Sequence, residues 1–296
     1  AHRGEIYDRN GVMVAENVKV YVMYMIPVYL PKNYFEREEL LYRVSKIFNI
    51  DLGQIKSILD KVPKNSYESI EIANNITMEQ ISYLAERSEE YPGVYYGSKS
   101  VRNYPLGETM THILGYIGNI SQEEFEDKRA EGYRRNSMIG KEGVEQFYDR
   151  ELRGIDGYVQ WIVDSRNRVK ETISPAVGRP IPGKKLILSI DSKIQKDAED
   201  LLYGQVGTII VSRPTTGEIL AMVSAPWYDP NIFIGKIDRE KYVELINNPA
   251  NPFWNKAIRG RYPPGSTFKL ILSSGSLAEG RITANTTRFC GGGMWI

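Results

Sequence analysis

Residues 3–30 are rich in apolar, β-branched and aromatic residues, which are typical of β-strands. Asp8-Arg9-Asn10-Gly11 interrupts this segment, and an Asn-Gly pair is the strongest short-range signal for a tight turn between two strands. We therefore predict a β-hairpin that turns at these four residues.

The pattern then changes to apolar residues three and four apart, which is typical of amphipathic helices. Within 37–62 polar residues and a glycine interrupt this spacing, so it predicts two short helices rather than one. A third helix is expected after Thr77, whose hydroxyl can cap the first turn. It should end before Pro92-Gly93, because neither residue continues a helix well.

The middle of the chain is divided into short pieces by glycine and proline. Segments 102–120 and 139–154 each predict a short helix between glycine-marked turns, and the charged stretch 121–137 between them predicts an exposed helix and loop. YVQWIV and RVKETI then predict two strands around a turn at 164–167. Three prolines and two glycines fall within 175–183, which favours a domain boundary there.

Beyond that boundary the pattern predicts a strand, a helix and two more strands. KLILSI alternates as a strand, Asp191 or Ser192 can cap a helix over 193–203, and VGTIIVSR and EILAMVSA flank a turn at 214–217. Because only a turn joins the last two strands, they must be antiparallel. The order of elements therefore indicates an α+β fold.

Length and composition limit the possible functions. At roughly 150 residues per domain, 296 residues favour two domains, which we place at 1–180 and 181–296. The 38 basic and 37 acidic side chains leave a formal charge of +1, so no general attraction to nucleic acid is expected. One cysteine and two histidines argue against a disulfide framework and a metal centre, and no cofactor is expected. No apolar run approaches the about 18 residues that span a bilayer.

The segment 261–280, RYPPGSTFKLILSSGSLAEG, is the one place where residue types and spacing suggest chemistry. Pro263-Pro264-Gly265 cannot continue a helix, whereas the following residues can, so Ser266 should lie at or beside a helix start. Lys269, three residues on, should place its ammonium on the same face, close to that hydroxyl. A partly neutral lysine can take the proton of a serine, and amides at a helix start can stabilise an oxyanion. The segment therefore predicts an acyl-serine enzyme.

The spacing of serine and lysine is by itself a weak signal. Both residues are so common that about one S-x-x-K pattern is expected by chance in a chain of this length. The alternative interpretation is a helix-capping serine followed by an exposed lysine. Two features favour the chemical interpretation, because the pattern occurs only once in the sequence and follows a turn that exposes a helix end.

The segment YPPGSTFK resembles the nucleophile motif of class B penicillin-binding proteins. RGEIYDRNG resembles the segment that follows the membrane anchor in this family. RNYPLGETMTHILGYIG and IGKEGVEQFYDRELRGIDG resemble its pedestal domain, while PGKKLILSID, TGEILAMVSAPWYDPN and NPFWNKAIRGRYPPGSTFK resemble the opening of its transpeptidase domain. These segments occur in the family's order and cover most of the chain, and they are most similar to the elongation-type subgroup, penicillin-binding protein 2.

The resemblance implies an α+β fold in two parts. Residues 1–180 would form a mixed α/β pedestal, similar to the penicillin-binding protein dimerisation domain. Residues 181–296 would form the first part of a transpeptidase domain related to serine β-lactamases, with an antiparallel sheet and helices. The implied place is the periplasmic side of the bacterial cytoplasmic membrane, held by an N-terminal helix that this chain lacks.

The activity that the resemblance implies is a peptidoglycan D,D-transpeptidase of cell elongation. Ser266 would attack the D-Ala-D-Ala bond of a stem peptide, and Lys269 would act as the general base. β-Lactam antibiotics would acylate the same serine. The implied partner is a membrane glycan polymerase, and neither a cofactor nor a nucleic acid is implied.

The later motifs of the family are not found in this chain. An S-x-N and a K-T-G element complete the family's site downstream, and SGS at 274–276 is too close to Ser266 to be the first of them. A truncated chain, an omitted later part and a non-catalytic relative remain open as explanations. The alternative function is therefore a cell-wall scaffold or β-lactam sensor that acts through its pedestal. The 296 residues alone are expected to be inactive.

Several other conspicuous residues are assigned structural roles. His112 beside an apolar run is expected to pack rather than carry protons. Cys290 lies between Phe289 and Gly291, with no histidine nearby, so we expect a partly buried structural thiol. The turn at Asp8 lacks the further carboxylates of a calcium loop.

Two clusters have both a functional and a structural interpretation. Tyr21, Tyr24 and Tyr29 can stack on a glycan, but strand aromatics more commonly pack a sheet, and we expect packing. Glu145 and Asp149 are four apart and can suggest a catalytic pair of carboxylates. On a helix followed by two arginines, they are expected to form a solvated, salt-bridged face instead.

Overall fold

The computed structural model describes residues 1–157, 160–163, 169–173, 179–235, 239–287, 289 and 291. Packing divides the chain into two compact units, Ala1–Ala257 and Ile258–Ile296. Each unit is described by itself. Cys290 and the turn predicted at 164–167 lie outside the described residues.

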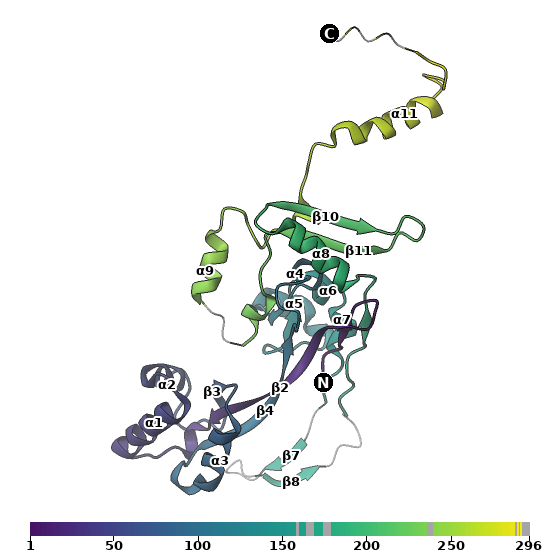
Figure 1. The fold of residues 1–296 in the computed structure, drawn as a ribbon. Coiled ribbons are helices and arrows are strands. Elements are labelled where there is room, and N and C mark those ends of the chain that lie inside the picture. Colours follow the sequence, from purple (N-terminus) through teal and green to yellow (C-terminus); the bar gives the residue numbers. More distant parts are fainter. Residues whose placement is uncertain are drawn as a thin grey trace. The chain divides into compact units, whose positions relative to one another are not determined.

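The first unit is built around β2 (Met13–Met25), a strand of 13 residues. It pairs with β1 (Ile6–Tyr7) across the Asp8–Gly11 turn, which confirms the predicted hairpin. Residues Glu16–Met25 of β2 also pair antiparallel with β4 (Val94–Asn103), and the strand end pairs with β3 (Ile70–Asn74). β1 pairs in parallel with β9 (Leu186–Ile187) on its other edge, so the sheet joins segments about 180 residues apart (Figure 1).

The three predicted N-terminal helices are confirmed and gather at one end of the long β2–β4 pair (Figure 1). They are α1 (Tyr34–Phe48), α2 (Leu52–Leu59) and α3 (Met78–Glu86). The side chains of Asn33, Asp51 and Thr77 cap them, and Thr77 forms a capping box with Gln80. Short 3₁₀ turns occur at Pro27–Tyr29 (η1) and Ser88–Glu90 (η2).

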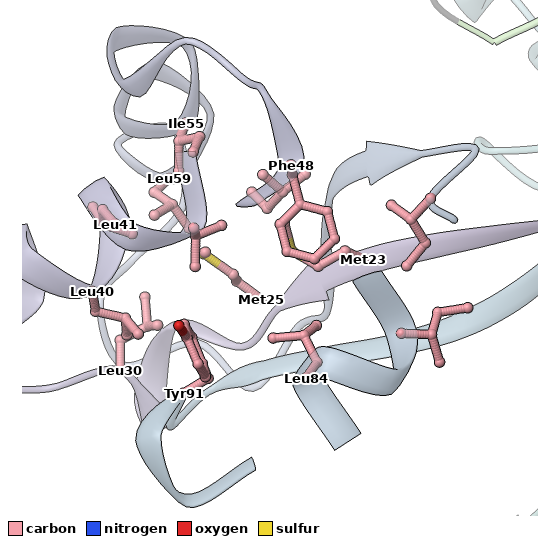
Figure 2. Packing of buried hydrophobic residues seen from close by; sticks show 14 residues of the cluster. Met23, Met25, Leu30, Leu40, Leu41, Phe48, Ile55, Leu59, Leu84 and Tyr91 are labelled. Atoms are coloured by element: carbon pink, nitrogen blue, oxygen red, sulfur yellow. The ribbon is translucent and has the colours of Figure 1, made fainter. Parts of the chain in front are cut away.

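One face of the β2–β4 sheet and these helices enclose the largest hydrophobic core (Figure 2). Met23 and Met25 project from β2 into this core and are fully buried. Leu40, Leu41 and Phe48 of α1 pack over them. The three-and-four spacing of the apolar residues in α1 therefore faces the sheet, as its pattern predicts.

Short elements follow between glycine turns. They are α4 (Thr111–Leu114), β5 (Ile117–Asn119), α5 (Gln122–Lys128), η3 (Arg129–Glu131), β6 (Met138–Gly140), α6 (Gly143–Phe147) and α7 (Asp149–Arg153). The exposed helix predicted within 121–137 is confirmed as α5. The prediction that the whole stretch is exposed is wrong at Tyr133, which packs with Ile120 and Ile139 in a small core.

The predicted strand pair β7 (Gln160–Val163) and β8 (Val169–Ile173) is confirmed as antiparallel. The strand predicted at KLILSI is shorter than expected, because only Leu186 and Ile187 have a strand partner. Further elements are α8 (Ser192–Leu202), β10 (Gly207–Ser212), β11 (Ile219–Ala225), η4 (Pro230–Phe233), α9 (Arg239–Asn247) and α10 (Lys256–Arg259). The helix capped by Asp191 and the antiparallel β10–β11 pair confirm two predictions.

A second hydrophobic core joins segments from both sides of the Pro/Gly stretch at 175–183. Ile6, Leu114 and Ile190 are buried in it, and Leu186 and Ile219 pack against it. The described residues form an α+β fold, as the order of predicted elements indicates. Within the described ranges, no helix combines the length and apolar character needed to cross a membrane.

The second unit contains η5 (Gly265–Thr267) and α11 (Phe268–Ala278). The helix predicted after the Pro-Pro-Gly turn is therefore confirmed. Ser266 lies in the 3₁₀ turn that leads directly into α11.

Candidate active site

The turn that carries Ser266 is fixed by its own backbone. Gly265 has a φ of +55°, a conformation that glycine adopts without strain. The Thr267 amide and hydroxyl both donate to the Pro264 carbonyl, at 3.3 and 2.5 Å. The Phe268 amide donates to the carbonyls of Gly265 and Ser266, which leads the turn into α11. The sequence PPGST thus places the serine directly before the first turn of the helix.

Ser266 and Lys269 are one helical turn apart, and both are exposed. Neither side chain has a hydrogen-bond partner within the described residues, and the Ser266 amide also has no backbone acceptor there. An unpaired amide at a helix start can stabilise an oxyanion. Ser266 therefore lies directly before α11 and Lys269 within its first turn, but no hydrogen bond joins the two side chains within the described residues.

The helix α11 is strongly apolar, yet its unit does not cover it. Phe268, Leu270, Ile271, Leu272 and Leu277 are between 47% and 74% exposed. Exposed apolar patches of this kind mark surfaces that pack against other protein.

The loop that precedes this segment in the first unit is held by buried polar groups. His112 Nε2 lies 2.7 Å from the Pro252 carbonyl oxygen, and the Ser224 hydroxyl donates to the Trp254 carbonyl. The Lys256 amide donates to Ser224 Oγ at 2.9 Å. These bonds fix the chain up to the last residues of the first unit.

Two of these groups have shifted pKa values. Burial lowers the pKa of His112 to about 4, although the bond to the Pro252 carbonyl opposes the shift. Burial also lowers the pKa of Lys256, whose ammonium donates to the Asn251 carbonyl. His112 is therefore neutral and packed edge-on against Tyr228, which confirms its expected structural role.

The Asp8 side chain is fully buried at its turn and holds two segments together. Its carboxylate accepts from the amides of Asn10 and Val12, both at 2.8 Å. It also accepts from the amide and the hydroxyl of Ser192 at the start of α8. The predicted turn at these residues is confirmed. Within the described ranges, no group of three or more His, Cys, Asp or Glu side chains is placed to hold a metal ion.

The expected solvated face at Glu145 and Asp149 is wrong, because both carboxylates are buried. Glu145 accepts from Arg3 Nε at 2.6 Å and from Arg102 Nε at 2.7 Å. Asp149 accepts from the other end of the Arg3 guanidinium at 2.7 Å and from the hydroxyl of Tyr133. The prediction of one helix here is also wrong, because Glu145 lies on α6 and Asp149 on α7. The cations that pair with these carboxylates, Arg3 and Arg102, are far away in sequence.

This ion network also changes the pKa of its members. Burial acts to lower the pKa of Arg3, but Glu145 and Asp149 outweigh it and raise that pKa above its ordinary value. Burial and then the bond to Asp149 raise the pKa of Tyr133. The network is a structural centre rather than a catalytic pair, because every carboxylate oxygen in it already accepts a hydrogen bond.

Comparison with known proteins identifies the family to which the chain belongs. The family model described as "Penicillin-binding Protein dimerisation domain" matches residues 1–188. The chain belongs to the penicillin-binding protein family. The model described as "Penicillin binding protein transpeptidase domain" matches residues 207–295, which include the Ser266 turn.

Relatives in this penicillin-binding protein family are similar along nearly the whole chain. The chain is 34% identical over 291 residues to "Peptidoglycan D,D-transpeptidase MrdA" of Escherichia coli strain K12, covering 97% of this chain and 45% of that protein. It is 35% identical over 299 residues to the protein of the same name in Haemophilus influenzae, covering 99% and 45%. The solved "Complex between Penicillin-Binding Protein (PBP2) and MreC from Helicobacter pylori" matches with a TM-score of 0.81 at 28% identity, covering 96% of this chain and 53% of that one. The chain spans about half the length of these relatives.

Proposed function

We propose that this protein acts as a peptidoglycan D,D-transpeptidase, with Ser266 as nucleophile and Lys269 as general base. The observation that carries the proposal is the turn at the start of α11, where Ser266, with its unpaired amide, lies directly before a helix whose second residue is Lys269. The match of the transpeptidase family model across this turn supports it, as does the similarity to relatives named peptidoglycan D,D-transpeptidase MrdA.

The proposed reaction has two steps. Ser266 Oγ attacks the carbonyl carbon of the penultimate D-alanine, Lys269 takes the hydroxyl proton, and the amide C–N bond breaks. The terminal D-alanine leaves with that proton. An amine of a neighbouring stem peptide then attacks the ester, forms the cross-link amide and returns a proton to Ser266 Oγ. The Ser266 amide is suited to stabilise the oxyanion in both steps.

We further propose that 1–180 form the pedestal and 181–296 the first part of the transpeptidase domain. The exposed apolar side of α11 supports the second part of this division, since the helix needs a covering surface. The proposed ligands are stem peptides that end in D-Ala-D-Ala and β-lactams. The proposed partner is a membrane glycan polymerase, at the periplasmic side of the cytoplasmic membrane. The solved complex of a similar protein with MreC supports an assembly of this kind.

The test is labelling of the intact protein with a fluorescent penicillin, followed by mass mapping of the adduct. We expect a single adduct on Ser266, no labelling of Ser266→Ala, and full labelling of the matched control Ser274→Ala on the exposed surface of the same helix. Lys269→Arg should label far more slowly, because a guanidinium does not lose its proton near neutral pH. A folded protein without any adduct would favour the scaffold alternative.

A further inference from the structure

A large groove crosses the first unit between the helical end of the sheet and the β5–β6 pair. Its volume is about 1620 Å³, which exceeds the roughly 300–1,000 Å³ of small-molecule sites. Val18, Val20 and Val101 line it from the sheet. One wall is formed by the α1–α2 junction and the β3–α3 turn, and the other by β5–β6 and η4. The size indicates a polymer rather than a small molecule.

The strand register shows that this sheet face is continuous. Val18 lies opposite Val101 and Val22 lies opposite Gly97, and the same face ends at the pair Tyr24 and Tyr95. The side chains in between, at odd positions of β2, belong to the other face, which packs the core shown in Figure 2. This face extends along the ten residues of β4, or about 30 Å at roughly 3.3 Å per residue, and only Val22 near its middle is buried among its β2 residues from Val18 to Tyr24.

Tyrosine rings cover the far end of this face. Tyr24 and Tyr95 are stacked with ring centroids 5.7 Å apart, and Tyr29 contacts both Tyr95 and Tyr67 edge-on. Tyr29, Tyr67 and Tyr95 are 39% to 47% exposed. Of the three tyrosines singled out in the sequence, Tyr21 packs against the core as expected. Tyr24 and Tyr29 instead belong to the exposed cluster.

The groove walls carry asparagine side chains whose amide groups have no hydrogen-bond partner within the described residues. Asn49, Asn75 and Asn119 line the groove, are exposed, and make no side-chain hydrogen bond within the described residues. The cations at its edges are already neutralised. Lys99 binds Glu71 at 2.6 Å, and Lys141 binds Glu124 at 2.6 Å. The groove therefore offers donors, acceptors and aromatic rings but little free charge.

We propose that this groove, together with the separate tyrosine cluster at the far end of the same sheet face, binds a neutral, N-acetylated, β-linked glycan strand. The C–H faces of pyranose rings pack against exposed aromatic rings, and acetamido groups exchange hydrogen bonds with asparagine amides. A charged peptide fits less well, because its charges would meet cations and carboxylates that are already paired. Peptidoglycan as the source of such a strand rests on the proposed function, whereas the chemistry of the groove does not.

The test is calorimetric titration of the 296-residue chain with chitohexaose, a neutral hexamer of β-1,4-linked N-acetylglucosamine. Tyr95→Val removes a ring from the cluster, and Tyr96→Val is its matched control, since Tyr96 is 43% exposed on the opposite face of the same strand. Asn75→Gly removes an amide without straining the backbone, because Asn75 has a φ of +55°. Thermal unfolding of each variant checks its fold, and the readout needs no acylation of Ser266.

We expect saturable binding of chitohexaose that Tyr95→Val and Asn75→Gly each weaken by about fivefold, while Tyr96→Val leaves it unchanged. Weaker binding of cellohexaose, which lacks acetamido groups, would support the role of the asparagines. Absence of saturable binding to the folded chain, or equal effects of Tyr95→Val and Tyr96→Val, would overturn the proposal. So would tight binding of an extended peptide in place of chitohexaose. Penicillin labelling of Ser266 is independent of all these outcomes.

Discussion

Glu145 provides the sharpest test of how the first unit is held together. Glu145→Gln keeps the size of the side chain but removes the charge that two buried arginines share, at 2.6 and 2.7 Å. The Arg102 side chain is fully buried, and its Nη2 already has no hydrogen-bond partner, so it cannot turn to water. Removing one partner of a buried ion pair costs about 3–5 kcal/mol, and we expect a loss of stability in this range.

The measurement is urea unfolding followed by circular dichroism. With a slope of about 3 kcal/mol per molar urea, the midpoint should fall by about 1 M or more. Glu151→Gln is the matched control, because Glu151 lies on α7 beside the network but is exposed, and its loss should stay within about 0.5 kcal/mol.

A double variant separates the network from a general effect of the substitution. In an Arg102→Leu background one of the two cations is gone, so Glu145→Gln should cost less than in the wild type, with a coupling of about 0.5–3 kcal/mol. Equal costs in both backgrounds, or a loss no larger than that of Glu151→Gln, would refute the view that paired charges stabilise this region.

Three further predictions address other parts of the first unit. The pKa of His112 is about 4 in the folded chain and about 6.5 for a free histidine. As the pH falls, the unfolded chain therefore binds this proton before the folded chain does. The free energy of unfolding should then fall by roughly 3 kcal/mol between pH 6.5 and pH 4. In urea unfolding across this pH range, His112→Asn should lack that part of the pH dependence. If the unfolding free energies of the wild type and the variant changed equally with pH, the lowered pKa of His112 would be contradicted. Asp8→Ala should cost about 2–3 kcal/mol, because Ser192 and the turn lose a buried carboxylate acceptor, and hydrogen exchange should rise first at the start of α8. Gly140→Ala should cost about 3 kcal/mol in thermal unfolding, since a Cβ there would lie 1.9 Å from the Glu145 carbonyl oxygen, whereas Gly275→Ala, with open space around it, should not.

Local signals were sufficient for the elements that depend on neighbouring residues. The Asn-Gly turn, the caps at Thr77 and Asp191 and the Pro-Pro-Gly stop before α11 each act within about four residues, and each prediction is confirmed. The position of Ser266 at a helix start is predictable for the same reason. Its chemical environment is not, because that depends on surfaces that pack against α11.

The features that sequence reasoning missed depend on distant partners. The burial of Glu145 requires Arg3 and Arg102, which are 142 and 43 residues away. The groove depends on the register of β2 and β4. A shift of one residue would turn the valines of the groove, and the tyrosines at the far end of the same sheet face, into the core. The one local signal for the groove was asparagine at two positions with left-handed backbone, Asn49 and Asn75, which follow an apolar helix and a strand.

The pairing of β1 with β9 has a consequence for synthesis on the ribosome. The core beneath β2 and β4 needs only residues up to about Val94, so it can form as soon as β4 has emerged. The core around Ile6 also needs Leu186 and Ile219, which are made later. At about 5–20 residues per second, the chain from Asn103 to Ile187, the end of β9, takes about 4 to 17 s to synthesise. During that interval β1 has a strand on only one edge, and the nascent chain exposes a sheet edge that a chaperone or a second nascent chain can bind.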